Sequence, residues 1–156
     1  MADESHPALI VRSGEDRFSE QRGFGITTLQ FKVVPADSDG LLVLENTFLT
    51  RGGPPRHLHY AQDEWFYVLA GEFLVEVGQE QTRLKVGDSI LAPRNIPHTL
   101  ANISDQPGKV LITFAPAGQM EAFFREMGKA NIMPGANPEI WRAHGLKLVG
   151  PPLKID

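Results

Sequence analysis

Residues 56–71 read Arg-His-Leu-His-Tyr-Ala-Gln-Asp-Glu-Trp-Phe-Tyr-Val-Leu-Ala-Gly and place two histidines and a carboxylate beside an aromatic, β-branched run. His57 and His59 are two positions apart, so in a β-strand both side chains leave the same face and their imidazoles can share one ion. Glu64 follows five positions after His59, which would put it on the opposite face of an unbroken strand. A turn or bulge within residues 60–63 would make Glu64 a third candidate ligand.

A fourth candidate ligand, His98, lies in a separate apolar stretch that also carries Pro93, Pro97 and Asn102. Two segments of the chain would then close on one site. The sequence contains no cysteine, which excludes disulfides, thiolate nucleophiles and sulfur-rich metal centres. Any metal bound by this chain is therefore held by nitrogen and oxygen atoms.

The composition is that of an ordinary globular protein. Of 156 residues, 42% are hydrophobic and 22% charged, with a formal net charge of -4, which disfavours a nucleic-acid partner. A chain of this length can bury one core, so we expect a single domain over residues 1–156. Residues 1–7 lack the features of a signal peptide and no run of about eighteen apolar residues occurs, so we expect no membrane partner and a cytoplasmic location.

Short runs of β-type residues recur every eight to twelve positions along most of the chain. This spacing is typical of a β-sandwich or barrel rather than of alternating βα units. The clearest predicted hairpin joins residues 65–69 to 73–77 around Gly71. A second hairpin is expected to join residues 26–34 to 41–50. Further strands are predicted at residues 9–11, 82–86, 89–92, 98–102 and 109–114.

The pattern changes after Pro116, where helical spacing replaces β-type alternation. Apolar side chains recur at helical intervals and Gly128 could end that helix, while Asn137-Pro138-Glu139 opens a second one. We expect two short helices within residues 119–144, packed outside the barrel, with the first facing the core or a second copy of the chain. The tail at residues 150–153 is expected to be an extended arm. The apolar stripe of the first helix consists of Met120, Phe123, Phe124 and Met127.

The two histidine-bearing segments resemble the paired motifs of the cupin superfamily. The first reads H-x-H, four residues, E, six residues, G, and ends at Gly71. The second reads G, five residues, P, four residues, H, three residues, N, and begins at Gly87. Two positions depart from the motifs, because Arg51 and Asn95 stand where glycines are expected. Asparagine tolerates a left-handed backbone better than other non-glycine residues, so the turn at Asn95 can survive.

The resemblance implies an all-β fold, a double-stranded β-helix (jelly-roll) barrel with a core over about residues 24–116 and two short C-terminal helices. It also implies a metal in the mouth of the barrel, bound by His57, His59, Glu64 and His98. A single barrel followed by two helices is similar to the small quercetin-dioxygenase-like bacterial cupins. That likeness implies an enzyme, a metal-dependent dioxygenase of the quercetinase type.

The chemistry of the four candidate ligands suits one divalent transition metal ion per chain, whether iron, manganese, nickel, copper or zinc. Such a set leaves positions open on an octahedral ion for a small-molecule substrate, dioxygen or water. Glu64 is also a candidate catalytic residue, since a loosely held carboxylate can accept a proton from a bound hydroxyl. The leading hypothesis is a dioxygenase or related oxidoreductase acting on a small oxygen-bearing compound, with aromatic compounds among the candidates. The alternatives are a metal-dependent isomerase or lyase and a non-catalytic small-molecule binder.

Several other residues are assigned plainer roles. Gln62 and Asp63 are expected to be exposed turn residues, and His6 and His144 to lie outside the site. Barrel edges need covering, which makes a homodimer the expected assembly. The residues expected either to fill the barrel or to line its cavity are Phe66, Phe73, Leu100 and Phe114.

Overall fold

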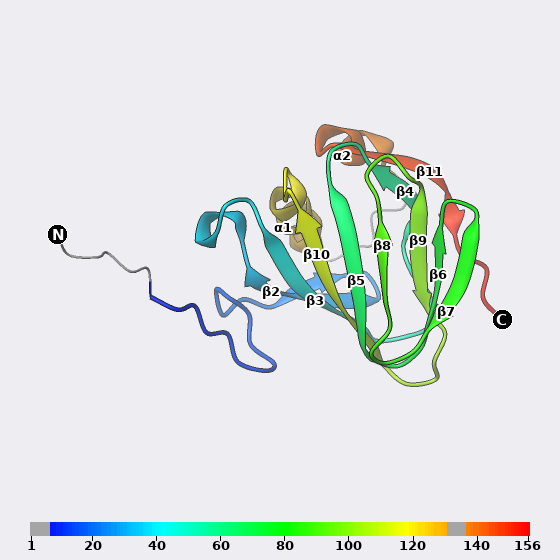
Figure 1. The fold of residues 1–156 in the computed structure, drawn as a ribbon, viewed down its shortest axis with the longest axis horizontal. Helices are drawn as coiled ribbons and strands as arrows, with labels where there is room; N and C mark the ends of the chain where they lie inside the picture. Colours follow the sequence, from blue (N-terminus) through cyan, green and yellow to red (C-terminus); the bar gives the residue numbers. More distant parts are fainter. Residues whose placement is uncertain (1–6, 131–136) are drawn as a thin grey trace.

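The computed structural model describes residues 7–130 and 137–156 and shows two β-sheets packed face to face (Figure 1). One sheet has six strands in the order β1-β2-β3-β10-β5-β8, and the other has five in the order β11-β4-β9-β6-β7. All strand pairings within them are antiparallel. This is the jelly-roll architecture that the sequence predicted.

The first sheet is built from β1 (Arg22–Phe24), β2 (Thr27–Val33), β3 (Leu42–Phe48), β5 (Asp63–Ala70), β8 (Ser89–Ala92) and β10 (Gly108–Ala115). The second is built from β4 (Pro55–His59), β6 (Phe73–Val77), β7 (Glu80–Leu84), β9 (His98–Asn102) and β11 (Leu146–Pro152). A short 3-10 helix (Pro35–Asp37) joins β2 to β3, and the helices α1 (Met120–Ala130) and α2 (Pro138–Ala143) follow β10.

Alternation of side chains along the strands builds the core. In β3, the side chains of Leu42, Leu44, Asn46 and Phe48 are buried while the intervening ones are partly exposed, as expected for a sheet with one face on a core. The inner faces of both sheets supply the aromatic and aliphatic side chains of that core. Several of the largest are almost fully buried, namely Phe31, Phe48, Phe66, Phe73 and Phe114.

One of the two expected hairpins is confirmed and the other is wrong. β2 and β3 pair directly, with Thr28 opposite Thr47. β5 pairs instead with β10 and β8, whereas β6 pairs with β7 and β9 in the other sheet. The turn at Gly71, with φ +80°, packs so closely on Gly108 that a Cβ would lie 3.0 Å from its Cα. The chain therefore crosses between sheets at Gly71 instead of folding back on itself.

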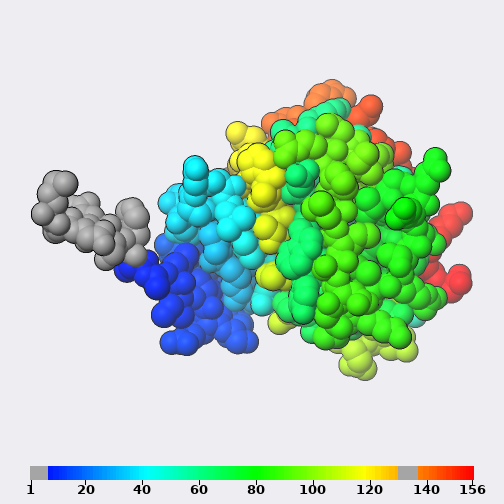
Figure 2. Space-filling model, in the orientation of Figure 1, coloured from blue at the N-terminus to red at the C-terminus, as the bar shows by residue number. Residues whose placement is uncertain are grey.

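The two ends of the chain also depart from expectation. The predicted strand at residues 9–11 is wrong, because this segment has no regular structure and Leu9 and Ile10 are 43% and 65% exposed. The tail at 150–153 is extended as expected, but most of it belongs to β11, which pairs with β4. The blue N-terminal residues form a lobe beside the main body in Figure 2, away from the green face made by β5 to β8.

The C-terminal helices form close to where they were expected. Gly128, expected to end the first helix, lies inside α1, which continues to Ala130. α2 begins after Asn137, whose side chain accepts a hydrogen bond from the Glu139 backbone N–H at 3.1 Å, a normal N-cap. Within the described residues, no helix has the length and apolar character needed to cross a membrane.

Gly53 brings the segment before β4 into close contact with β9. A Cβ added to Gly53 would lie 1.8 Å from the Leu100 backbone oxygen, which is far inside van der Waals contact. The neighbouring Gly52 forms a two-hydrogen-bond bridge with Asn102, each bond 3.0 Å long. Although Arg51 stands at the glycine position of the motif, these two glycines provide the close approach that brings the two histidine-bearing strands together.

We predict that Gly53→Ala lowers the free energy of unfolding by about 2 kcal/mol or more, because the new methyl group forces β9 away from β4. Urea denaturation of the metal-free protein would measure this change. Gly150→Ala is the matched control, since its Cβ would meet Arg56 atoms at 3.5 Å, an ordinary contact. Equal stabilities of the two variants would contradict the close-packing account.

Candidate metal centre

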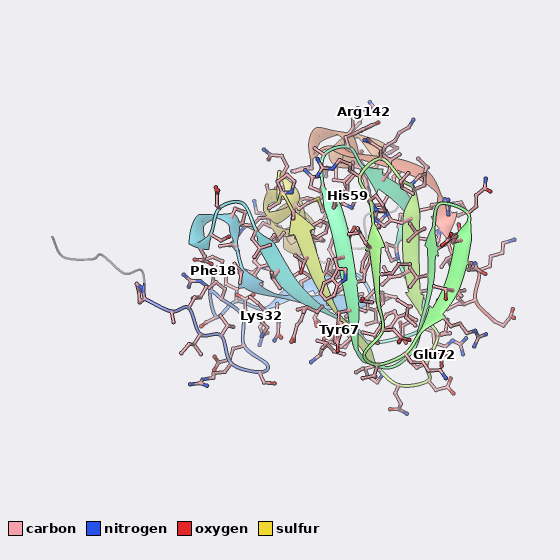
Figure 3. The ribbon with its side chains drawn as sticks, viewed as in Figure 1. Phe18, Lys32, His59, Tyr67, Glu72 and Arg142 are labelled. Atoms are coloured by element: carbon pink, nitrogen blue, oxygen red, sulfur yellow. The ribbon has the colours of Figure 1, made fainter. Side chains whose placement is uncertain are left out.

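Three strands bring the four candidate ligands together. β4 supplies His57 and His59, β9 supplies His98, and β5 supplies Glu64. The three imidazoles thus come from the five-stranded sheet and the carboxylate from the six-stranded sheet. Their ligand atoms all lie within 4.8 Å of one another, and all four residues are buried. Figure 3 places His59 near the same end of the sheets as Arg142 of α2, far from Glu72.

Strand register explains why these side chains converge. His57 lies opposite His98 in the β4–β9 pair, and their ring centroids are 4.7 Å apart. Residues 60–62 belong to no strand and separate β4 from β5. The expected turn is therefore present, and Glu64 points inward. The backbone N–H of Asn95, which has φ +65°, donates to the His59 carbonyl at 2.7 Å. Asn95 thus adopts the left-handed turn expected for it and ties the loop before β9 to the end of β4.

Backbone carbonyls set the orientation of two imidazoles. Nδ1 of His57 lies 2.8 Å from the Pro55 oxygen, and Nδ1 of His98 lies 3.0 Å from the Ile96 oxygen. A carbonyl can only accept, so the hydrogen in each pair is on Nδ1. When a metal is bound and the ring is neutral, Nε2 can then offer its lone pair to the ion. This is the usual arrangement of a metal-binding histidine, whose second nitrogen is held by a backbone group.

The contacts at Glu64 have the geometry of ligands that share one cation. Its Oε2 atom lies 2.8 Å from Nε2 of both His59 and His98. The contact with His59 has the length of a hydrogen bond but not the alignment, and Nε2 and Nδ1 of His59 are both buried without a hydrogen-bond partner. Two donor atoms held at right angles about 2.1 Å from one ion lie about 3 Å apart. The nitrogen and oxygen atoms of this cluster therefore fit a divalent transition metal ion.

Two members of the cluster, His57 and Glu64, have shifted pKa values that suit metal binding. Burial, followed by the charges of His98 and His59, holds the pKa of His57 well below 6.5, although Glu64 and the Pro55 carbonyl oppose this. Burial would raise the pKa of Glu64, but the charges of His59 and His98 and their hydrogen bonds outweigh it and hold that pKa far below 4.5. At neutral pH the site thus presents a neutral His57 and a carboxylate.

The surroundings of the cluster correct two sequence predictions. Gln62, expected to be exposed, is buried, because its amide packs against Gly118 just before α1. Asp63 is partly exposed and binds Arg94, whose backbone N–H donates to its carboxylate at 2.9 Å. His144 lies outside the cluster, as expected, with Nδ1 2.8 Å from the Ile140 oxygen. His6 lies outside the described residues.

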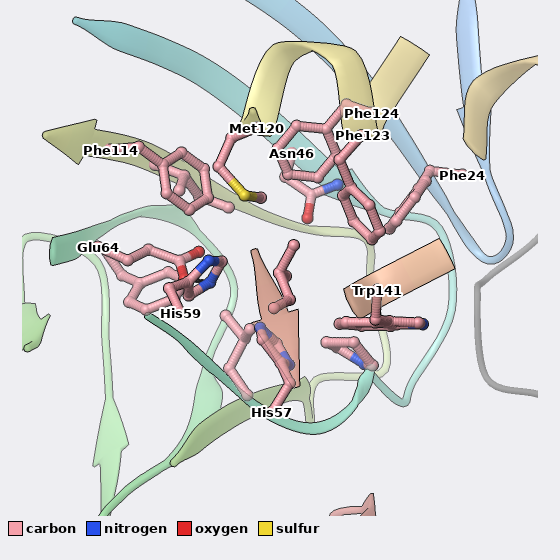
Figure 4. Close-up of a pocket in the computed structure, with 15 residues that line it drawn as sticks. Phe24, Asn46, His57, His59, Glu64, Phe114, Met120, Phe123, Phe124 and Trp141 are labelled. Atoms are coloured by element: carbon pink, nitrogen blue, oxygen red, sulfur yellow. Dashed lines mark ion pairs between the residues drawn. The ribbon is translucent and has the colours of Figure 1, made fainter. Parts of the chain in front are cut away.

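A cavity of about 50 Å³ opens beside the cluster, bounded by His57, His59 and Glu64 (Figure 4). The wall is otherwise mostly apolar. Of the four residues expected to fill the barrel or line a cavity, three line it and Phe73 packs in the core. The remaining lining residues are Phe24, Asn46, Pro54, Phe66, Leu100, Ile112, Phe114, Met120, Phe123, Phe124, Trp141 and Leu146.

Of the lining residues that sequence reasoning missed, Trp141 and Asn46 matter most for the chemistry of the cavity. Trp141 of α2 is 2% exposed and its ring centroid lies 5.0 Å from that of His57, so the helix covers the cavity rather than lying apart from it. Asn46 interrupts the apolar inward positions of β3 between Leu44 and Phe48. A polar side chain at an inward position of an alternating strand was a signal that the sequence contained. Nothing local indicated the position of Trp141.

Comparisons with known proteins agree with this arrangement. Residues 47–114 match the family described as "Cupin domain". The uncharacterized protein MJ1618 of Methanocaldococcus jannaschii is 37% identical over 60 residues, which are 38% of this chain and 48% of that protein. The chain spans about half the length of the curated relatives it matches.

Two solved structures extend the comparison. KdgF from Halomonas sp. has a TM-score of 0.61 and 20% identity, covering 71% of this chain and 94% of its own, which is a likeness of fold alone. An RmlC-like cupin from Shewanella frigidimarina has a TM-score of 0.57 and 25% identity, covering 65% of this chain and 87% of its own. The family match shows that residues 47–114 form a cupin domain, and the two solved structures share its fold.

Proposed function

We propose that this cupin binds one divalent transition metal ion through His57, His59, Glu64 and His98 and acts as a metal-dependent dioxygenase or related oxidoreductase. The substrate is a small, oxygen-bearing and enolisable compound. One observation carries the proposal, namely that three of the four ligands, His57, His59 and Glu64, line a cavity whose other walls are mostly apolar. The ion, when bound, would supply Lewis acidity and open coordination positions for oxygen ligands.

The protein's own residues bind and shield the reacting groups. The Pro55 and Ile96 carbonyls hold the rings of His57 and His98 in orientation. Trp141 packs on His57 and, with Phe123 of α1, closes one side of the cavity. An apolar enclosure keeps bulk water from the reacting atoms and strengthens electrostatic interactions inside it.

Glu64 accepts the substrate proton at a carboxylate oxygen. Against the effect of burial, His59 and His98 hold the pKa of this carboxyl far below its usual range, so it is ionised near neutral pH, and any carboxylate is a weak base. A weak base takes protons efficiently only from acidic hydroxyl groups, because proton transfer depends on the match of the two pKa values. This favours enols and phenols over the alcohol groups of sugars.

The size and lining of the cavity narrow the substrate further. A cavity of about 50 Å³ has room for roughly three to five water molecules. A flavonol exceeds this space unless α1 and α2 move, whereas a short β-diketone comes much closer to it. In the described part of the chain, the cavity lining includes no lysine or arginine, and such side chains would be expected in a site for sugars or phosphates.

A single domain over residues 1–156, a homodimer and a cytoplasmic location stay predictions.

The first prediction from this site concerns metal content. We expect one divalent ion per chain in protein purified from metal-replete medium, and His98→Ala should lower the occupancy at least severalfold, because one bond and the cluster geometry are lost together. Elemental analysis after dialysis would measure this. His144→Ala is the matched control, since it removes a histidine outside the cluster. Full occupancy in the His57→Ala/His98→Ala double variant would contradict the site.

The second prediction concerns the metal-free protein. Because the folded pKa of His57 is lowered from 6.5, the unfolded chain binds a proton there at a pH where the folded chain does not. Stability should therefore fall as the pH drops below about 6.5, and again below about 4.5 as Glu64, whose folded pKa is also lowered, loses its carboxylate. Thermal melts from pH 8 to 4 would show this. His57→Gln should flatten the upper part of the curve, and an unchanged slope would argue against His57.

The third prediction tests the reaction. Protein loaded with iron, manganese, nickel or copper should consume oxygen with a short β-diketone or a catechol, and less or none with a flavonol. Glu64→Gln should reduce kcat more than it raises KM, because it keeps the shape of the side chain but removes its basicity. An oxygen electrode would follow the reaction, with metal content measured for each variant so that lost ion is not mistaken for lost basicity.

If no loaded form consumes oxygen with any of these compounds, the oxidoreductase assignment fails. A sugar or hydroxy acid that still raised the melting temperature of the loaded protein would then favour an isomerase, a lyase or a binding module.

A further inference from the structure

Asn46 is a polar residue on a wall of the cavity that otherwise carries apolar side chains. It lies in the middle of β3, opposite Leu29 of β2 and Val110 of β10. Its side chain is directed inward and is only 7% exposed. In Figure 4, its amide is on the opposite side of the cavity from His57, across from the ligand cluster.

The orientation of this amide follows from its one hydrogen bond. Nδ2 donates to the Thr28 backbone oxygen at 3.1 Å. Because a carbonyl oxygen can only accept, the nitrogen must occupy that side and the oxygen the other. Figure 4 shows the side-chain oxygen directed into the cavity. The backbone of β2 therefore aims Oδ1 of Asn46 at whatever the cavity holds.

The Oδ1 atom of Asn46 is free to accept hydrogen bonds. Among the described residues, no side chain or backbone group donates a hydrogen bond to it. Oδ1 is not one of the fully enclosed, unpaired side-chain atoms of the described residues, so it faces accessible space, and leaving it without water or a ligand donor there would cost roughly 1–3 kcal/mol. A leucine, which fills the equivalent inward position two residues earlier, would avoid that cost. An amide here is useful when the occupant of the cavity carries a donor.

We propose that Asn46 orients the substrate, with Oδ1 accepting a hydrogen bond from a hydroxyl or N–H group of a ligand whose oxygen atoms at the other end bind the metal. This rests on the proposed function and refines its substrate class. The substrate is a short compound with two polar ends, chelating oxygens at one and a hydrogen-bond donor at the other. Asn46 rejects compounds that present a methyl or ether group there, because these leave Oδ1 desolvated and unpaired.

Small hydroxamates supply a matched set of probes, since their two oxygens chelate divalent transition metals while the rest of the molecule can be varied. Glycolohydroxamate carries a terminal hydroxyl where propanohydroxamate carries a methyl group of similar size. 3-Hydroxypropanohydroxamate and butanohydroxamate repeat this pair with one more methylene. Titration calorimetry with the metal-loaded protein would give the four dissociation constants.

At the chain length that spans the cavity, the hydroxyl probe should bind roughly five- to tenfold more tightly than its methyl partner. Asn46→Leu should reverse this preference, because an unpaired hydroxyl is then buried in an apolar wall. Metal content should be unchanged in that variant. Thr47→Val is the matched control, since it also removes a polar group from β3 but at a partly exposed position on the other face, and it should keep the preference.

The outcomes separate this inference from the function on which it rests. If the wild-type protein binds both methyl probes as tightly as their hydroxyl partners, or if Asn46→Leu keeps a preference for hydroxyl, the role of Asn46 is overturned and the metal site stands. If no hydroxamate binds the loaded protein, the metal-centred function fails together with this role. Should Asn46→Leu not fold, the wild-type comparison and Asn46→Ser, which is too short to reach the same point, decide the question.

Discussion

The contact of one carboxylate oxygen with two imidazole nitrogens is the constraint on which the rest of this structure depends. Oε2 of Glu64 lies 2.8 Å from Nε2 of His59 and from Nε2 of His98. Glu64 belongs to one sheet and both histidines to the other, so the cluster joins the two layers at one end. Polar groups buried in this way are costly unless they are paired or coordinate a metal. An ion shared by all four would satisfy them and join the sheets, so metal binding should also stabilise the fold.

Close packing on both sides of the cluster keeps these atoms in place. Gly53 allows the chain to approach β9 within a distance that excludes any side chain, and this positions His57 opposite His98. On the other edge of β4, β11 pairs with the same strand and places Leu146 opposite His59. The site is therefore built mainly on strands rather than on loops. Rigid placement of this kind is what a metal centre or a catalytic centre needs.

The cavity combines an apolar wall with very few polar groups, which is the usual composition of a small-molecule site. Its chemistry is concentrated at two places, the four-residue cluster and the amide of Asn46. Glu64 is a carboxylate at neutral pH, because against the effect of burial His59 and His98 hold its pKa down, and Trp141 limits the space above His57. Specificity would then follow from acidity at one end of the substrate, a hydrogen-bond donor at the other and a short distance between them.

The sequence by itself determined the features that depend on local spacing. Two-residue alternation identified most of the strands, although not β1 or β11, the His57–His59 spacing predicted a shared face, and the asparagine at 95 predicted a left-handed turn. The paired motifs predicted that four distant residues would meet, and they do.

Only the tertiary structure decided which strands pair. The alternation in β5 and β6 is the same whether they form a hairpin or belong to different sheets, because the pattern records which face is buried and not which strand is the neighbour. The burial of Gln62, the position of Trp141 over His57 and the free oxygen of Asn46 follow from those long-range pairings, so no local pattern could establish them.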